Sequence, residues 1–220
     1  LDADPAIAYL PFDVICGDTR AKRRGAGAPA VAAARRTNWS RLPDRLCGVE
    51  FCTALYDSAW NIYAPIADAV FTKPYQLHWG PDPARFIENE ESVIQTAIEA
   101  AAPCPSVWIP ERFKRNRHVE GRELRLMAWM ALCQGVKGIR YHYWMNNMSD
   151  PFGECPDLGE AMQAVNGDIQ RLEPILGPLL PVQAQADRRQ QIKVYEGWSG
   201  DRGILLLVRN MRYATDNRAN

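Results

Sequence analysis

The sequence predicts an α/β domain with a parallel sheet, followed by the start of an antiparallel β domain. From residue 46 to about residue 181, short apolar runs alternate with helix-like segments, which is the pattern of βαβ units. Beyond that point two strand-like runs follow one another with only a turn between them, which is the pattern of a β-hairpin. We therefore expect one domain over residues 1–181 and a second over residues 182–220.

The first two strand–helix units follow each other closely along the chain. A strand is expected at residues 46–51, and helical spacing follows over 55–67. A second strand is expected at 69–75, and apolar residues then recur at three- and four-residue steps over 88–101. Pro103 ends this helix, because proline has no backbone N–H to donate.

Two further units complete the predicted parallel sheet. A strand at 106–110 precedes the clearest helix, at 120–134, and Gly135 follows where a C-terminal cap is expected. Residues 136–144 form the next strand. Asp157 then opens a long amphipathic helix with the pattern of a capping box.

The two ends of the chain differ in how clearly they can be interpreted. Residues 191–198 alternate polar and apolar side chains, and an apolar run over 203–210 follows the turn, so we predict an antiparallel hairpin. Near the start, segments 6–10 and 12–16 are each either a strand or a short buried helix. The Gly- and Ala-rich stretch after them is expected to be a loop and a helix.

Composition excludes several classes of function. Lys and Arg together number 26, as do Asp and Glu, so the chain has no net charge to attract nucleic acid or an anionic membrane. The basic stretch from Arg20 to Arg24 lacks interleaved aromatic residues. No apolar run reaches the roughly 20 residues that span a bilayer. We therefore expect neither a nucleic-acid partner nor a membrane span; compartment and oligomeric state cannot be inferred.

The sequence predicts neither a metal site nor a cofactor. The 6 cysteines include no Cys-x-x-Cys pair and the 3 histidines are scattered, so ligand spacing for zinc is missing. The stretch from Gly25 to Gly27 has neither the third glycine nor the Gly-Lys-Ser/Thr of a phosphate-binding loop.

Several segments resemble the C-terminal half of the barrel of clan A glycoside hydrolases and their uncharacterised bacterial relatives. Residues 105–113 resemble a late barrel strand, 122–132 the helix after it, 135–141 the final strand, 166–176 the closing helix and 205–210 part of the β-sandwich that often follows. The resemblance implies a partial (β/α)8 (TIM) barrel with a C-terminal antiparallel β-sandwich segment. Four strands cannot close an eight-stranded barrel, so we expect the chain to lack the earlier strands or to contain at most one or two of them before residue 46.

The resemblance also implies a catalytic residue. In this clan the nucleophile is a glutamate at the end of the seventh strand, which corresponds to Glu111 if residues 136–144 are the eighth. A retaining mechanism needs a second carboxylate close by. The Asn-Glu pair of the clan has no counterpart in a suitable place, so Glu50, Asp13 and Asp18 are the fallback candidates. The alternative is that Glu111 forms a salt bridge with Arg112 or Lys114 beside it.

Aromatic residues gather where two of the predicted strands end, which suits a carbohydrate partner. Sugar rings present flat C–H faces that pack on aromatic rings, while His and Tyr bond to hydroxyl groups. Alternation along each strand turns about half of such side chains into the core. Trp144 is the strongest candidate for a sugar platform. The predicted substrate-binding residues are Tyr75, His78, Trp79, Tyr143 and Trp144.

Two interpretations of function remain open at this point. In the first, a carboxylate pair at the C-terminal face of the barrel hydrolyses a glycosidic bond. In the second, the barrel is catalytically inactive and binds carbohydrate or has a structural role, which accounts for the aromatic residues without a carboxylate pair.

Overall fold

The computed structural model describes residues 7–9, 28–41, 43, 46–52, 57–75, 85–111, 119–141, 156–182, 184–187 and 189–211. The first part of the chain contains β1 (Ile7–Tyr9), α2 (Ala28–Arg41), β2 (Leu46–Cys52), α3 (Asp57–Tyr63), η1 (Ala64–Ile66) and β3 (Ala69–Lys73). The middle contains α5 (Phe86–Ala101), β4 (Ser106–Trp108), α6 (Gly121–Cys133), β5 (Gly138–Ile139) and α7 (Pro156–Leu176). The last part contains β6 (Leu180–Pro181), β7 (Gln185–Asp187), β8 (Ile192–Trp198), η3 (Gly200–Arg202) and β9 (Ile204–Asn210).

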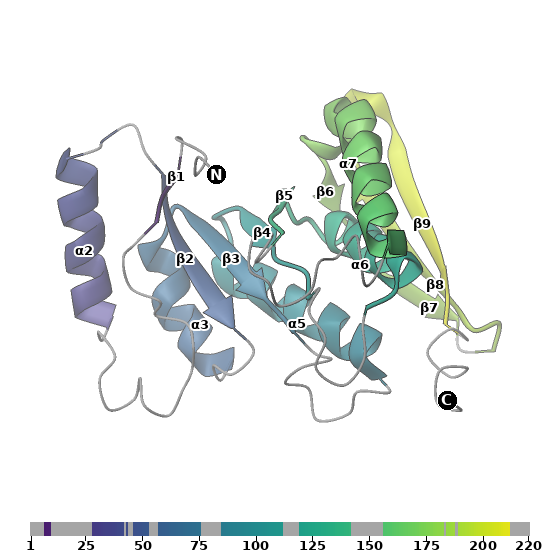
Figure 1. Ribbon diagram of the computed structural model, residues 1–220, viewed down its shortest axis with the longest axis horizontal. Helices are drawn as coiled ribbons and strands as arrows, with labels where there is room; N and C mark the ends of the chain where they lie inside the picture. Colours follow the sequence, from purple (N-terminus) through teal and green to yellow (C-terminus); the bar gives the residue numbers. More distant parts are fainter. Residues whose placement is uncertain are drawn as a thin grey trace.

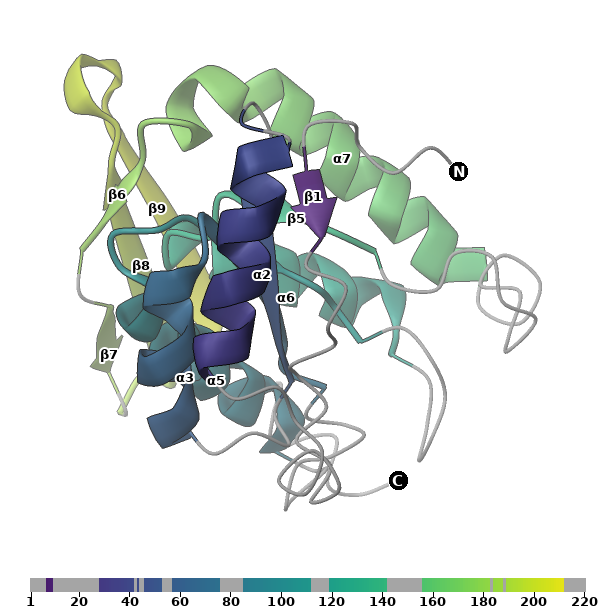
Figure 2. The same cartoon turned by 90° about the vertical axis from the view of Figure 1, so that its left-hand side faces the viewer.

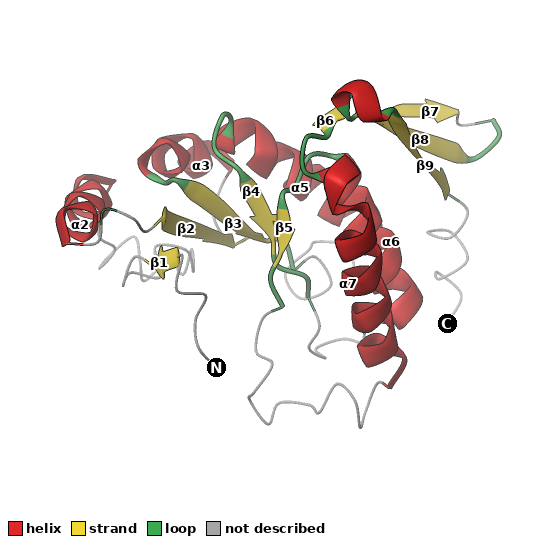
Figure 3. Ribbon diagram, turned by 90° about the horizontal axis from the view of Figure 1, so that it is seen from above, coloured by secondary structure: helices red, strands yellow, loops and turns green. Residues whose placement is uncertain are grey.

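Strands β1 to β5 form a parallel sheet in which spatial order equals chain order (Figure 1). Helices α2, α3 and α5 lie on one side of it (Figure 3), and α2 and α3 lie side by side (Figure 2). Crossovers of one hand that always step to the next strand put successive helices on the same face. The predicted parallel α/β sheet is therefore confirmed, and its N-terminal segment 6–10 contributes a strand.

Side chains that alternate along β2 and β3 divide the sheet into two faces. Val49, Phe51 and Val70 pack with residues of α3, η1 and α5 in one buried cluster. Within it the rings of Phe51 and Trp60 stack with centroids 5.4 Å apart and an interplanar angle of 6°. Because neighbouring strand residues point to opposite faces, Glu50 and Phe71 lie on the face away from these helices.

Local signals define α6 at both ends. The side chains of Glu120 and Glu123 form a capping box at its start, where the Glu120 backbone N–H donates to Glu123 over 2.9 Å. At its end Gly135 has a positive φ of 105°, and the N–H groups of Gly135 and Val136 donate to Leu132 and to a carbonyl five residues back, a Schellman motif. The cap predicted at Gly135 is confirmed.

Asp157 has a different role from the predicted one. It is the second residue of α7, so it is not the N-cap of that helix. Its carboxylate instead accepts a hydrogen bond of 2.8 Å from the backbone N–H of Gly121, the first residue of α6. The two helices approach so closely that a Cβ on Gly121 would overlap the Asp157 backbone. A capping pattern in the sequence identifies a side chain that can cap a helix, but it does not show which helix terminus that side chain contacts.

The last parallel strand is shorter than the predicted one. Only Gly138 and Ile139 pair with β4, and backbone hydrogen bonds from Lys137 and Arg140 extend the ladder by one residue at each side. Residues 142–144, which were also expected in this strand, lie outside the described residues.

Strands β6 to β9 form a separate antiparallel sheet. The predicted hairpin is confirmed, because β8 and β9 pair along their full length, from Ile192 opposite Asn210 to Trp198 opposite Ile204. β6 already belongs to this sheet, so the change from one sheet to the other occurs at Leu180. The inner face of this antiparallel sheet packs on α6, and Tyr195 of β8 is buried in the same cluster as Trp108 of β4.

A buried charged cluster ties this sheet to α5. The carboxylate of Glu91 accepts hydrogen bonds from Lys193, from the Tyr195 hydroxyl over 2.8 Å and from Arg209 over 2.9 Å. Arg209 also reaches Glu88 at 3.3 Å. Burial raises the pKa of Tyr195, and the negative charge of Glu91 raises it further.

Among the described helices, none is both long and apolar enough to cross a membrane.

Candidate active site

Charged side chains meet on the face of the parallel sheet that α3 and α5 do not cover. Glu50 of β2 forms ion pairs with Lys73 at the end of β3 and with Arg140 just after β5, the latter at 3.3 Å. The Glu50 side chain is 17% exposed and that of Lys73 is 10% exposed. A carboxylate this far from water needs such partners, because desolvating an unpaired charge is costly.

An aromatic ring underlies this charged group. The guanidinium of Arg140 lies over the ring of Phe71, 5.8 Å from its centroid, in cation–π geometry. The same ring lies against Gly48, where an added Cβ would overlap it. Gly48 therefore leaves the space on β2 that the Phe71 ring occupies next to Arg140.

Glu111 follows β4 at its carboxyl end and is 2% exposed. Trp108 turns toward α5, where its indole N–H donates to Glu90 over 2.8 Å. Val107 and Ile109 belong to the cluster on the opposite face. Glu111 comes three residues after the last residue of β4, so it lies beyond the carboxyl end of that strand.

Tyr75, predicted to bind substrate, lies beside this cluster. It is 5% exposed and packs with Phe71 and Ile109. Its φ of 43° is in the left-handed region, which is rare for an aromatic residue and is a form of backbone strain often found at functional sites. Tyr75 and Ile109 thus pack together beyond the carboxyl ends of β3 and β4.

The other predicted positions cannot be compared with the structure. His78, Trp79, Tyr143 and Trp144 lie outside the described residues, as do Asp13, Asp18, Arg112 and Lys114. Tyr141, two residues before Tyr143, is described, and its hydroxyl donates to Asn166 of α7 over 3.1 Å. Burial raises the pKa of Tyr141 to about 12.

Glu50 is a poor candidate for the catalytic acid. An acid that protonates a leaving group has to present a proton to the substrate, whereas both carboxylate oxygens of Glu50 face cationic donors. The two ion pairs instead hold Glu50, Lys73 and Arg140 together on the face of the sheet away from α3 and α5.

Lys73 and Arg140 are site residues that sequence reasoning missed. Lys73 is the last residue of β3 and Arg140 follows β5 directly, and each precedes an aromatic residue within two positions. That placement at a strand end was the available signal, because carboxyl ends of parallel strands meet at one edge of a sheet. Their common partner Glu50 could not be identified without knowing the strand order.

In the described part of the chain, no group of three or more His, Cys, Asp or Glu side chains is arranged to hold a metal ion. Comparison of the chain with protein-family models, with curated proteins and with solved structures gave no match.

Proposed function

We propose that the chain is part of a (β/α)8 barrel that acts on carbohydrate, and that Glu111 is the nucleophile of a glycoside hydrolase. The observation that supports this most is the position of Glu111. It is buried just beyond the carboxyl end of the parallel strand β4, and the charged group of Glu50, Lys73 and Arg140 lies on other strands of the same sheet. Active sites of such barrels are built from residues at this end of the strands.

The strand order supports the barrel. A parallel sheet whose spatial order follows the chain, with helices on one face, has no point where the order reverses. Doubly wound sheets bind their ligands at such a reversal. A singly wound sheet curls toward closure, and its inner face is filled by layers of side chains. Phe71, Glu50 and Arg140 contact one another on the face away from the helices and would belong to such a layer in a closed barrel.

The chemistry needs a carboxylate that attacks the anomeric carbon. Lys73 and Arg140 would keep positive charge beside the site and hold Glu50 as their common counter-ion. Tyr75, packed on Ile109, would fix the wall next to Glu111. The acid that protonates the leaving group is left unassigned, because Glu50 is engaged.

That engagement favours a second candidate function, a catalytically inactive barrel that binds carbohydrate. Among the described residues of this sheet face, Glu50 is the carboxylate with defined ion pairs. Both of its oxygens are paired, one with Lys73 and one with Arg140. Sugar binding by the aromatic residues would then be retained without bond cleavage.

The test is hydrolysis of a panel of 4-nitrophenyl glycosides that differ in sugar and anomeric configuration. We expect Glu111→Gln to lower turnover on the order of 10³-fold or more, because the neutral amide cannot act as nucleophile. Glu160→Gln is the matched control, since this glutamate is exposed on α7, and its turnover should equal that of the parent chain.

Two outcomes would contradict the hydrolase. If Glu111→Gln retained full turnover, Glu111 would not be the nucleophile. If the parent chain cleaved no glycoside but bound saccharides in calorimetry, the inactive barrel would be the better description.

A further inference from the structure

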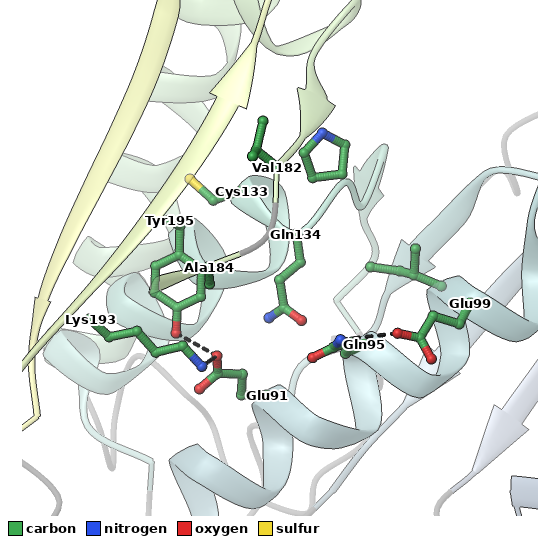
Figure 4. A pocket seen from close by; sticks show the side chains of 11 residues that line it. Glu91, Gln95, Glu99, Cys133, Gln134, Val182, Ala184, Lys193 and Tyr195 are labelled. Atoms are coloured by element: carbon green, nitrogen blue, oxygen red, sulfur yellow. Dashed lines mark hydrogen bonds and ion pairs between the residues drawn. The ribbon is translucent and has the colours of Figure 1, made fainter. Parts of the chain in front are cut away.

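A cavity of about 490 Å³ lies where α5, the end of α6 and the antiparallel sheet meet (Figure 4). Its volume falls in the range of pockets that take small organic ligands. No residue of the parallel sheet lines it, so it is distinct from the site at Glu50 and Glu111. The polar part of its lining consists of Glu91, Gln95, Glu99, Gln134, Lys193 and Tyr195.

Gln134 is the unusual member of this lining. Its amide oxygen and amide nitrogen are both buried, and neither has a hydrogen-bond partner in the described part of the molecule. Figure 4 shows the amide pointing into the space between α6 and α5. A buried amide without partners costs free energy, and native structures normally satisfy such groups. In this conformation the two amide atoms have almost no accessible surface, so a ligand in the cavity that both donates to and accepts from Gln134 reaches them through a change of rotamer.

The position of Gln134 is fixed by the backbone. It is the C-cap of α6, immediately before Gly135 in the Schellman motif. The cap fixes the backbone of this residue at the edge of the cavity, while the side chain can still change rotamer. A ligand in the cavity therefore needs no unwinding of the helix end to reach the amide.

The charge of Glu91 at the cavity is compensated within the protein. Glu91 accepts hydrogen bonds from Lys193, Tyr195 and Arg209. On the α5 wall Gln95 donates to Glu99 over 3.0 Å, so acceptor oxygens predominate there. A ligand with a net negative charge would face two carboxylates, and a neutral ligand with several donors fits better.

The remaining wall is apolar. Ile98 comes from α5, Pro181, Val182 and Ala184 from the segment entering the antiparallel sheet, and the ring of Tyr195 from β8. An apolar wall opposite amides and carboxylates suits a molecule with a C–H face and a rim of hydroxyl groups. Such a hydroxyl both donates and accepts, which matches the amide of Gln134.

We propose that this cavity is a binding site for a neutral monosaccharide or disaccharide, with Gln134 as the residue that pairs with adjacent hydroxyl groups. Gln95 and Glu99 accept hydrogen bonds from further hydroxyl groups of the sugar. The Tyr195 ring and Val182 pack against the C–H face of the sugar. The site rests on this geometry and does not depend on catalysis by Glu111.

The experiment measures binding of glucose, galactose, xylose, maltose and cellobiose to the full chain by ligand-observed NMR. Gln134→Leu keeps the size of the side chain and removes its donor and acceptor. We expect it to weaken binding by at least about tenfold. Gln170→Leu is the matched control because Gln170 is exposed on α7, and it should bind as the parent chain does.

A second measurement separates binding from folding. If the amide lacks partners in the free protein, Gln134→Leu should leave the urea midpoint unchanged or raise it while binding is lost. Binding that persists in Glu111→Gln and disappears in Gln134→Leu assigns the saccharide to the cavity.

Three results would overturn the proposal: no saccharide binds, Gln134→Leu binds as well as the parent chain, or ethanolamine binds where the sugars do not. The last would assign the cavity to cations held by Glu99.

Discussion

The charged cluster around Glu91 gives the most direct test of how the two sheets are joined. Glu91→Gln removes one charge and leaves the shape of the side chain almost unchanged. Arg209, with a side chain only 2% exposed, then keeps a single acidic partner, Glu88 at 3.3 Å, and Lys193 loses its carboxylate. Breaking a buried ion pair from one side typically costs about 3–5 kcal/mol, and because Glu88 remains we expect about 3 kcal/mol.

The assay is equilibrium unfolding in urea, followed by circular dichroism, with hydrogen exchange to locate the effect. Exchange should increase in α5, β8 and β9, and it should change little in β2 and β3, which do not touch the cluster. Asp168→Asn is the matched control. Its partners Arg171 and Arg125 are 74% and 54% exposed, so this change should cost no more than about 1 kcal/mol.

A double-mutant cycle isolates the ion pair itself. Arg209→Met places an apolar side chain next to Met130, whose sulfur lies 3.8 Å from the Arg209 Nη1 atom. The double variant Glu91→Gln/Arg209→Met should lose less free energy of unfolding than the sum of the losses of the two single variants. The reason is that neither Glu91 nor Arg209 then remains as a buried charge without its partner. A loss below about 1 kcal/mol for Glu91→Gln, or additive single effects, would refute the assignment of the cluster as the joint between the sheets.

Two further predictions concern packing and pH. Gly48→Ala should lower the free energy of unfolding by about 1–3 kcal/mol, because its Cβ overlaps the Phe71 ring, whereas Gly167→Ala, which has open space around it, should be neutral or stabilising in the same urea titration. Burial raises the pKa of the Cys133 thiol from 9.0 to about 11. Between these values the unfolded chain loses the thiol proton and the folded one keeps it, so stability should fall as pH rises from 9 to 11, by about 3 kcal/mol at most. Cys133→Ala should flatten that part of the pH profile, and an equally steep profile in the variant would contradict the assignment.

Local patterns in the sequence were sufficient for most of the secondary structure. The spacing over 120–134 predicted α6 and its cap at Gly135, and the hairpin at 191–198 and 203–210 was recognised from alternation and a turn. These features depend on residues within a few positions of one another. Their free energies come from caps and from side-chain period, both of which are visible in a single segment.

Register within a strand was also accessible in part. Alternation predicted that neighbouring residues face opposite sides, and β9 follows it: Leu205 and Leu207 pack toward the core, while Leu206 and Val208 are 59% and 60% exposed. The apolar run itself carries no such distinction. All of these residues are hydrophobic, and only the presence of α6 on one side of the sheet decides which of them are covered.

The partners of the charged side chains were decided by the tertiary structure alone. Arg140 reaches Glu50 across 90 residues of chain, and Arg209 reaches Glu91 across 118. Asp157 caps a helix that begins 36 residues before it. A charge at a strand end indicates an edge of the sheet, but the partner depends on which strands become neighbours. The sequence by itself therefore determined the elements and their faces, whereas strand order and helix packing determined which buried charges meet, because a desolvated charge must be paired with whichever group the fold brings within reach.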